Sequence, residues 1–180
     1  MNWRNITLVG LLFLVVGLLT PKGQLLVMGY YDKLKSLITG LEGLRLEAYQ
    51  DITGHWTIGY GHLIKPGEVY YPYGATRLIT SEEAELIFQA DTANAERCID
   101  RFVVVPLTEN QRAALVSFIF NTGCGAFQSS HLLQYVNAGD FVRAAEEFGK
   151  WVLSTQPDGS KITLAALVDR RAQEKQVFLA

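Results

Sequence analysis

The sequence has few cysteines and no surplus of basic residues. Its 180 residues include only two cysteines, Cys98 and Cys124, which is too few for a disulfide-dense mini-scaffold or for a zinc site built from cysteines. The three histidines are scattered without the spacing of a metal site. With a formal net charge of −2, the chain also lacks the basic excess that is typical of nucleic-acid-binding proteins. We therefore expect no metal ion, no other cofactor and no nucleic-acid partner.

Acidic residues are absent from one part of the chain. Residues 1–31 contain Arg4 and Lys22 but no acidic side chain, whereas residues 32–180 carry 14 basic and 18 acidic residues. After a short polar start, residues 6–20 form a mostly apolar run without a charged side chain, which is the pattern of a secretory signal or a membrane anchor. We therefore divide the chain into an N-terminal signal-anchor segment, residues 1–31, and a globular domain, residues 32–180.

The length of the run leaves three interpretations open. As a helix, the 15 residues 6–20 would span about 22 Å, less than the bilayer core of about 30 Å. A cleaved signal peptide would need small residues at a cleavage site, and a permanent anchor would usually be longer and lack Gly10 and Gly17. A signal-anchor that inserts and is later released fits the run best. Arg4 before the run predicts a cytoplasmic N-terminus and a globular domain in the periplasm.

Hydrophobic periodicity further along predicts an α+β domain that is mostly helical. Short strands and tight turns are expected over residues 47–62, where β-branched and aromatic residues alternate with glycine. Thr80 and Glu83 form a capping box at a helix start. The predicted helices cover residues 32–41, 80–102, 106–120, 129–136, 140–151 and 163–178. This order predicts a small lobe with the strands, a larger helical lobe and a binding cleft between them.

Two carboxylic residues near the predicted strands could carry catalysis. Glu42 stands at the end of a predicted helix, where the helix dipole and neighbouring leucines would raise its pKa and keep it protonated. Asp51 follows in a polar turn, where we expect it to stay ionised. Such a pair can break a glycosidic bond, and Thr57 offers a hydroxyl that could hold a water. On spacing alone, residues of these types are more often solvated surface groups.

The motifs around these residues form a longer pattern. They read Glu42-Gly43-Leu44-Arg45-Leu46, then Tyr49-x-Asp51, then Gly54-x-x-Thr57-Ile58-Gly59-x-Gly61-His62-Leu63. Further motifs lie within residues 107–123, 126–130, 137–140, 150–151 and 167–174. In this order they closely resemble the phage-type lysozymes, glycoside hydrolase family 24, over roughly residues 32–179. The resemblance implies a two-lobed, lysozyme-like fold and muramidase activity.

The resemblance also implies roles for the three candidate catalytic residues. Glu42 would be the general acid, Asp51 would assist the attacking water and stabilise positive charge on the sugar, and Thr57 would position that water. Family members are generally inverting, so we expect the two carboxyl groups to lie about 6.5–9.5 Å apart or slightly more, with room for a water between them.

Supporting residues follow from the same resemblance. The residues implied to line the sugar cleft are Leu63, Phe120, Asn121 and Ser130, although Phe120 could equally belong to the core. His62 could be an extra acid or base, but a structural histidine paired with an acid is favoured. Arg171 resembles the family arginine that approaches the catalytic glutamate, and Arg170 is the alternative because adjacent helix residues face different ways.

The two cysteines leave a separate question open. A Cys98–Cys124 disulfide in the oxidising periplasm and two buried free thiols are equally compatible with the sequence. Some relatives hold their membrane-bound form inactive through a cysteine inside the anchor. Residues 6–20 contain no cysteine, which excludes a disulfide exchange with the anchor in this chain.

Together these features predict a monomeric signal-anchor-release endolysin. It would be exported by the Sec machinery, held in the host inner membrane by residues 6–20 and released to the periplasm when the membrane depolarises, in functional partnership with a holin or pinholin. There it would hydrolyse the β-1,4 bond between N-acetylmuramic acid and N-acetylglucosamine in peptidoglycan and lyse the host cell. The alternative is a non-catalytic peptidoglycan-binding or membrane-anchored protein on the same fold.

Overall fold

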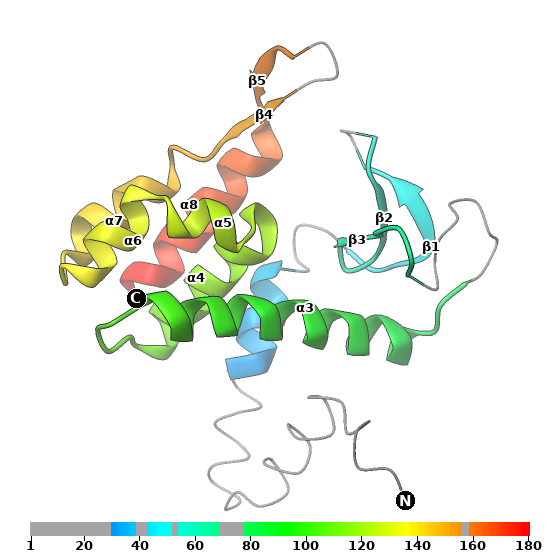
Figure 1. Cartoon of the computed structure of the whole chain (residues 1–180), viewed down its shortest axis with the longest axis horizontal. Helices are drawn as coiled ribbons and strands as arrows, with labels where there is room; N and C mark the ends of the chain where they lie inside the picture. Colours follow the sequence, from blue (N-terminus) through cyan, green and yellow to red (C-terminus); the bar gives the residue numbers. More distant parts are fainter. Residues whose placement is uncertain (1–29, 39–42, 52–53, 69–77, 156–158) are drawn as a thin grey trace, which may run out of the picture.

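The chain folds into a small sheet-containing lobe and a larger helical lobe (Figure 1), as the sequence predicts. The computed structural model describes residues 30–38, 43–51, 54–68, 78–155 and 159–180. A helix covers residues 30–38. The labelled elements are β1 (Arg45–Gln50), β2 (Trp56–Gly59), β3 (His62–Leu63), α3 (Ser81–Phe102), α4 (Glu109–Thr122), α5 (Cys124–Gln128), α6 (His131–Asn137), α7 (Phe141–Phe148), β4 (Leu153–Thr155), β5 (Lys161–Thr163) and α8 (Ala165–Leu179).

The small lobe is an antiparallel sheet of order β1-β2-β3. Thr57 lies on the central strand, opposite Tyr49 on one side and Leu63 on the other. Gly59 ends β2 with a φ of 67°, and a Cβ at this position would lie 3.7 Å from the Cβ of Ala84. A left-handed backbone and a close approach to α3 thus both favour glycine at this position.

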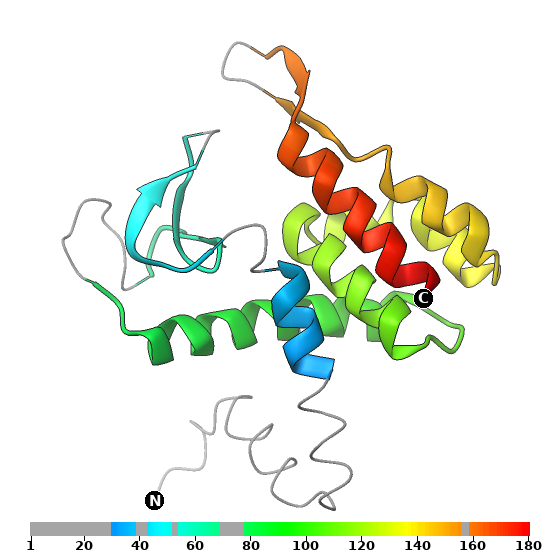
Figure 2. The ribbon, with the colours of Figure 1, turned by 180° about the vertical axis from the view of Figure 1, so that it is seen from behind.

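Helix α3 connects the two lobes and runs beneath both of them (Figure 2). The predicted capping box is confirmed: Thr80 accepts from the Glu83 backbone N–H, and the Glu83 side chain accepts from the Thr80 backbone N–H. Ala84, in the first turns of α3, packs beneath the sheet. Ile99, near the other end, packs in the helical core. One helix therefore fixes the position of the sheet against the helical lobe.

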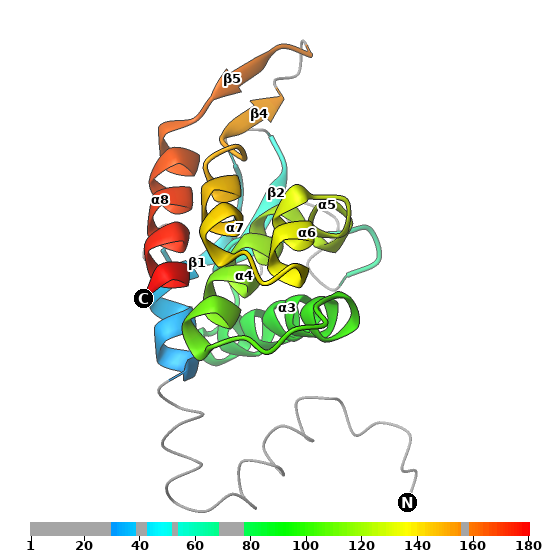
Figure 3. The ribbon, with the colours of Figure 1, turned by 90° about the vertical axis from the view of Figure 1, so that its left-hand side faces the viewer.

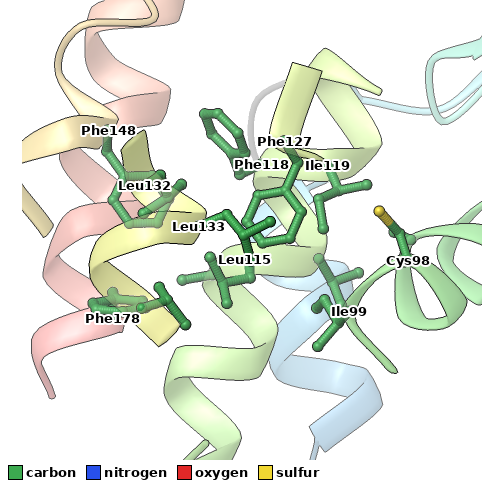
Figure 4. Close-up of a cluster of buried hydrophobic side chains, with 14 of the residues drawn as sticks. Cys98, Ile99, Leu115, Phe118, Ile119, Phe127, Leu132, Leu133, Phe148 and Phe178 are labelled. Carbon is green, nitrogen blue, oxygen red and sulfur yellow. The ribbon is translucent and has the colours of Figure 1, made fainter. Parts of the chain in front are cut away.

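The helical lobe is built around α4, whose residues 113–119 are all buried. Helix α8 lies beside α4 and α7 (Figure 3). The Phe118 ring meets the Phe148 ring edge-on at a centroid distance of 5.5 Å and the Trp151 ring at 5.3 Å, an arrangement that aromatic pairs favour. Figure 4 shows these helices contributing to one apolar core.

The structure joins Cys98 of α3 to Cys124 of α5 by a disulfide, with their Cα atoms 5.9 Å apart. The alternative of two free thiols, which the sequence left open, is therefore excluded. The bridge ties the connecting helix α3 to the segment that directly follows α4.

Several predicted boundaries differ from the structure. The residues after 120 were expected to be a break between helices, but α4 continues to Thr122 and α5 begins at Cys124. Helix α7 ends at Phe148 rather than near Trp151. The β4–β5 hairpin was not predicted, because strands of three residues give too short a pattern. Glu42 and the apolar run 6–20 lie outside the described residues. Within the described part of the chain, no helix has the length and apolar character needed to cross a membrane.

Candidate active site

A cavity of about 520 Å³ lies between the two lobes. Residues of the small lobe on its walls include Tyr49, Asp51, Thr57, His62 and Leu63, and residues of the helical lobe and α3 include Asp91, Ile119, Phe120 and Asn121. The structure thus brings Asp51 and Thr57 to one cleft, as the sequence predicts. Glu42 is not described, so its place in this cleft and its distance from Asp51 stay predictions.

Asp51 stands directly after β1, in a turn that its own hydrogen bonds close. Its Oδ1 accepts from the backbone N–H of His55 at 2.9 Å, and its backbone N–H donates to the carbonyl of the same residue at 2.9 Å. Gly54, with a φ of 82°, provides the left-handed residue in this turn. The Asp51 side chain remains 37% exposed and lies on the wall of the cleft.

Thr57 is fixed by the same neighbour as Asp51. Its side chain is buried, and its hydroxyl donates to the carbonyl oxygen of His55 at 3.2 Å. The backbone N–H of His55 therefore orients the Asp51 side chain, and the backbone C=O of His55 orients the Thr57 side chain. Because the hydroxyl hydrogen is used in this bond, the oxygen of Thr57 keeps its capacity as an acceptor, to which a water in the cleft can donate.

Three of the four predicted sugar-cleft residues line this cavity. Leu63 is 46% exposed there, and Asn121 lies at the end of α4. Phe120 lines the cavity and also packs against Phe88, with ring centroids 6.1 Å apart. For Phe120, the two interpretations that the sequence left open thus both apply.

Ser130, the fourth predicted sugar-cleft residue, is not among the residues that line this cavity. It is buried and is the N-cap of α6, where its hydroxyl accepts from the Leu133 N–H at 3.1 Å and donates to the Phe127 carbonyl at 2.7 Å. A serine that uses its hydroxyl to cap a helix has a structural role. Its predicted contact with the sugar chain stays a prediction.

His62 bridges two carboxylates, which fits the interpretation as a structural histidine. Its Nδ1 lies 2.7 Å from Asp91 Oδ2 and its Nε2 lies 3.0 Å from Glu68 Oε2. Burial alone would lower the pKa of His62, but the hydrogen bonds and charges of the two acids outweigh it, so this pKa is raised. The interaction with Asp91 ties β3 to α3. Among the described residues, no three His, Cys, Asp or Glu side chains are grouped as they would be to hold a metal ion.

Arg171 is buried in the helical lobe and reaches toward the cleft. Its Nη1 donates to Glu174 Oε2 at 2.6 Å and its Nη2 donates to Asn121 Oδ1. Burial raises the pKa of Glu174 to about 7 against the opposing charge of Arg171, whose own pKa is lowered by burial. The predicted approach of Arg171 to Glu42 lies outside the described residues. Arg170, the alternative, lines a second cavity.

This second cavity, of about 870 Å³, lies on the other side of Asp51 and was not predicted. Residues on the walls of both cavities are Tyr49, Asp51, Asn121 and Thr122. The β4–β5 hairpin and the start of α8 supply its outer wall. Because the sequence pattern did not predict the hairpin, it did not predict this cavity either. Asp51 therefore lies where the two cavities meet, and together they form the groove.

Comparisons with known proteins agree with this arrangement. The sequence model of a family described as Phage lysozyme matches residues 39–174. An endolysin of Acyrthosiphon pisum secondary endosymbiont phage 1 is 40% identical over 144 residues, covering 79% of this chain and 92% of that protein. A SAR-endolysin of Escherichia phage Mu is 35% identical over 152 residues, covering 84% of this chain and 82% of that protein.

A solved structure shares the fold. The endolysin from Escherichia coli O157:H7 phage FAHEc1 superimposes with a TM-score of 0.73 at 37% identity, covering 82% of this chain and 90% of that one. The predicted two-lobed, lysozyme-like fold is therefore confirmed. For some curated relatives, the chain spans only about half of their length.

Proposed function

This chain belongs to the phage lysozyme family, and from this premise we propose that it is an endolysin that hydrolyses the β-1,4 bond between N-acetylmuramic acid and N-acetylglucosamine of bacterial peptidoglycan. The observation that carries the proposal is the shared anchoring of Asp51 and Thr57 on His55, at the wall of the cleft between the lobes. A carboxylate and a hydroxyl held in this way face the same bound molecule.

In the proposed reaction, one water is added across the glycosidic bond. Glu42 gives its proton to the leaving oxygen, while the water donates one hydrogen bond to the Thr57 oxygen. Asp51 accepts a proton from this water and stabilises the positive charge that develops on the sugar. Attack from the face opposite the leaving group inverts the anomeric centre, so we expect the α-anomer of the new reducing end to appear first in an NMR time course.

The membrane stage of the proposal concerns residues 1–31 and the helix over residues 30–38. We propose that the Sec machinery exports the chain, that residues 6–20 hold it in the inner membrane, and that a holin or pinholin triggers its release to the periplasm. The similarity to a SAR-endolysin supports this sequence of events. Helix 30–38 docks on the helical lobe through the contact of Tyr31 with Thr92 at 3.2 Å and of Lys33 with Asn110 at 2.6 Å. Anchoring would pull this helix from its docking site and misplace Glu42, which follows it in the sequence.

Fractionation tests this membrane stage. Cells expressing the full chain are separated into membrane and periplasmic fractions before and after addition of an uncoupler. The proposal expects an intact N-terminus in both fractions and a transfer to the periplasm only after depolarisation. A periplasmic form that already starts beyond residue 20 would show cleavage instead, and a chain that stays in the membrane would show a permanent anchor.

A lysis assay tests the proposed hydrolase activity. Outer-membrane-permeabilised cells are treated with the wild-type chain and with Glu42→Gln. The matched control is Glu146→Gln, which changes an exposed glutamate that pairs with Lys175. We expect lysis by the wild type and the control, and loss of lysis with retained peptidoglycan binding for Glu42→Gln. Binding without lysis by all three chains would favour the alternative of a non-catalytic peptidoglycan-binding protein.

A further inference from the structure

Four polar side chains form a hydrogen-bonded chain from the core of the helical lobe to the cleft. Ser117 donates to Glu174 Oε1 at 2.7 Å, and Arg171 donates to Glu174 Oε2 at 2.6 Å. The other end of the Arg171 guanidinium donates to Oδ1 of Asn121. The first three side chains are at most 1% exposed, whereas Asn121 is exposed and lines the cleft.

Stability alone does not explain this buried chain. The desolvation cost of a buried ion pair usually consumes its attraction, so apolar residues of similar size often stabilise a core equally well. Arg171 is not among the residues that line either cavity. It is linked to the groove through its hydrogen bond to Asn121, which lies 50 positions earlier in the sequence.

The Arg171 contact sets the orientation of the Asn121 amide. A guanidinium carries donors and no acceptor, so the Asn121 atom that faces it has to be the carbonyl oxygen. A flipped amide would place its NH₂ group against the guanidinium and lose the bond. The Phe118 ring, 4.9 Å from the guanidinium carbon, supports the guanidinium on one face. The NH₂ group of Asn121 is thereby turned away from Arg171.

We propose that Arg171 is a positioning residue, which fixes the Asn121 amide so that its N–H donors bind an acceptor oxygen of the sugar chain in the cleft. This inference rests on the proposed function, because it assigns Asn121 a contact with the substrate. The carbonyl oxygens of N-acetyl groups and the sugar hydroxyls are acceptors of the required kind. Since the contact holds the substrate before reaction, its loss raises KM more than it lowers kcat.

The first test removes Arg171 and its buried partner together. Arg171→Met/Glu174→Leu leaves no unpaired charge in the core. The matched control, Lys175→Met/Glu146→Leu, removes an exposed 2.9 Å ion pair between α8 and α7. Both full-length variants are assayed in detergent on soluble, uncross-linked peptidoglycan glycan strands. We expect KM to rise about threefold to tenfold in the first variant, by a larger factor than kcat falls, and neither to change in the control. A folded first variant with unchanged KM would overturn the proposal.

A double-mutant cycle separates positioning from a merely structural effect. Asn121→Ala is made in the wild type and in the Arg171→Met/Glu174→Leu background. If Arg171 acts through Asn121, this change raises KM in the wild type and has little further effect in the second background. Full additivity of the two effects would contradict the proposal.

Two further measurements complement this cycle: the first does not use the double variant, and the second does not require turnover. Asn121→Asp keeps an acceptor for Arg171 but removes both donors, so it should raise KM to the same extent while the free energy of unfolding is maintained; an unchanged KM overturns the proposal. In ¹⁵N-labelled chains, the Asn121 side-chain amide resonance should shift in Arg171→Met/Glu174→Leu and not in the control, and an unshifted resonance also overturns it. If the resonance shifts but the wild type shows no turnover, this result would instead count against the proposed function.

Discussion

The two lobes of this molecule are stabilised in different ways. Among the residues that the structure describes, the core of the helical lobe contains 19 buried apolar residues, whereas the cluster under the sheet contains four, Ile58, Ile64, Ile79 and Ala84. The small lobe depends more on hydrogen bonds within its turns and on the contact of His62 with Asp91. Asp51 and Thr57 belong to this smaller lobe, while Phe120 and Asn121 come from the helical lobe. The proposed catalytic residues of the small lobe thus share one cavity with residues that the larger core holds.

The largest effect on stability should come from the core of the helical lobe. Phe118 is fully buried among aromatic rings, so Phe118→Ala should lower the free energy of unfolding by about 3–5 kcal/mol. Urea unfolding followed by circular dichroism measures this loss. Amide hydrogen exchange extends the comparison: Phe118→Ala should lower protection throughout the molecule, whereas Ile58→Ala should lower it mainly in β1–β3. Identical exchange patterns for the two variants would break the comparison between the lobes.

The disulfide should have the next largest effect. Cys98 and Cys124 are 26 residues apart in the sequence, and closing a loop of this length restricts the unfolded chain by about 3–4 kcal/mol. We expect Cys98→Ser/Cys124→Ser to lower the urea midpoint accordingly, and dithiothreitol to have the same effect on the wild type but none on the variant. An equal urea midpoint for the two chains would mean that the bridge does not form in solution.

The smallest effect concerns the His62 contacts, and it depends on pH. Because the pKa of His62 is raised in the folded state, this group stabilises the fold at pH values below its ordinary pKa of about 6.5. This stabilisation is lost as pH rises through the folded-state pKa. Burial would raise the pKa of Glu68, but the hydrogen bonds that it accepts from His62 and Lys65 lower this pKa. Glu68 therefore stabilises the fold above about pH 4.5, and this stabilisation is lost as pH falls. His62→Gln should therefore cost about 1 kcal/mol between about pH 4.5 and 6.5. Unfolding curves across pH measure this window, and a cost independent of pH would exclude an ionic contribution.

Sequence patterns predicted the features that depend on neighbouring residues. Helix α3 and its Thr80 cap follow from a local rule, and so does the start of α6 at Ser130. A motif matches the residue type of Ser130, but only the fold shows that its hydroxyl bonds to backbone groups within the chain. The turn around Asp51 was also predictable, because its hydrogen bonds span four residues.

Features that depend on distance in space could not be predicted. The Cys98–Cys124 bridge required a Cα separation that no spacing in the sequence provides. The contact of Arg171 with Asn121 joins residues 50 positions apart, so a pattern of helical periodicity contains no signal for it. The β4–β5 hairpin pairs two strands of three residues, too few to show alternation, and the outer part of the groove was missed for that reason.

The chemistry of the new chain ends tests the central claim most directly. Peptidoglycan is digested with the wild type, with Asp51→Asn and with the control Glu146→Gln, and the products are reduced with borohydride. We expect the wild type and the control to release strands ending in reduced N-acetylmuramic acid, and Asp51→Asn to release them at least about a hundredfold more slowly. Ends of reduced N-acetylglucosamine, or equal release by Asp51→Asn, would contradict the assignment of this cleft.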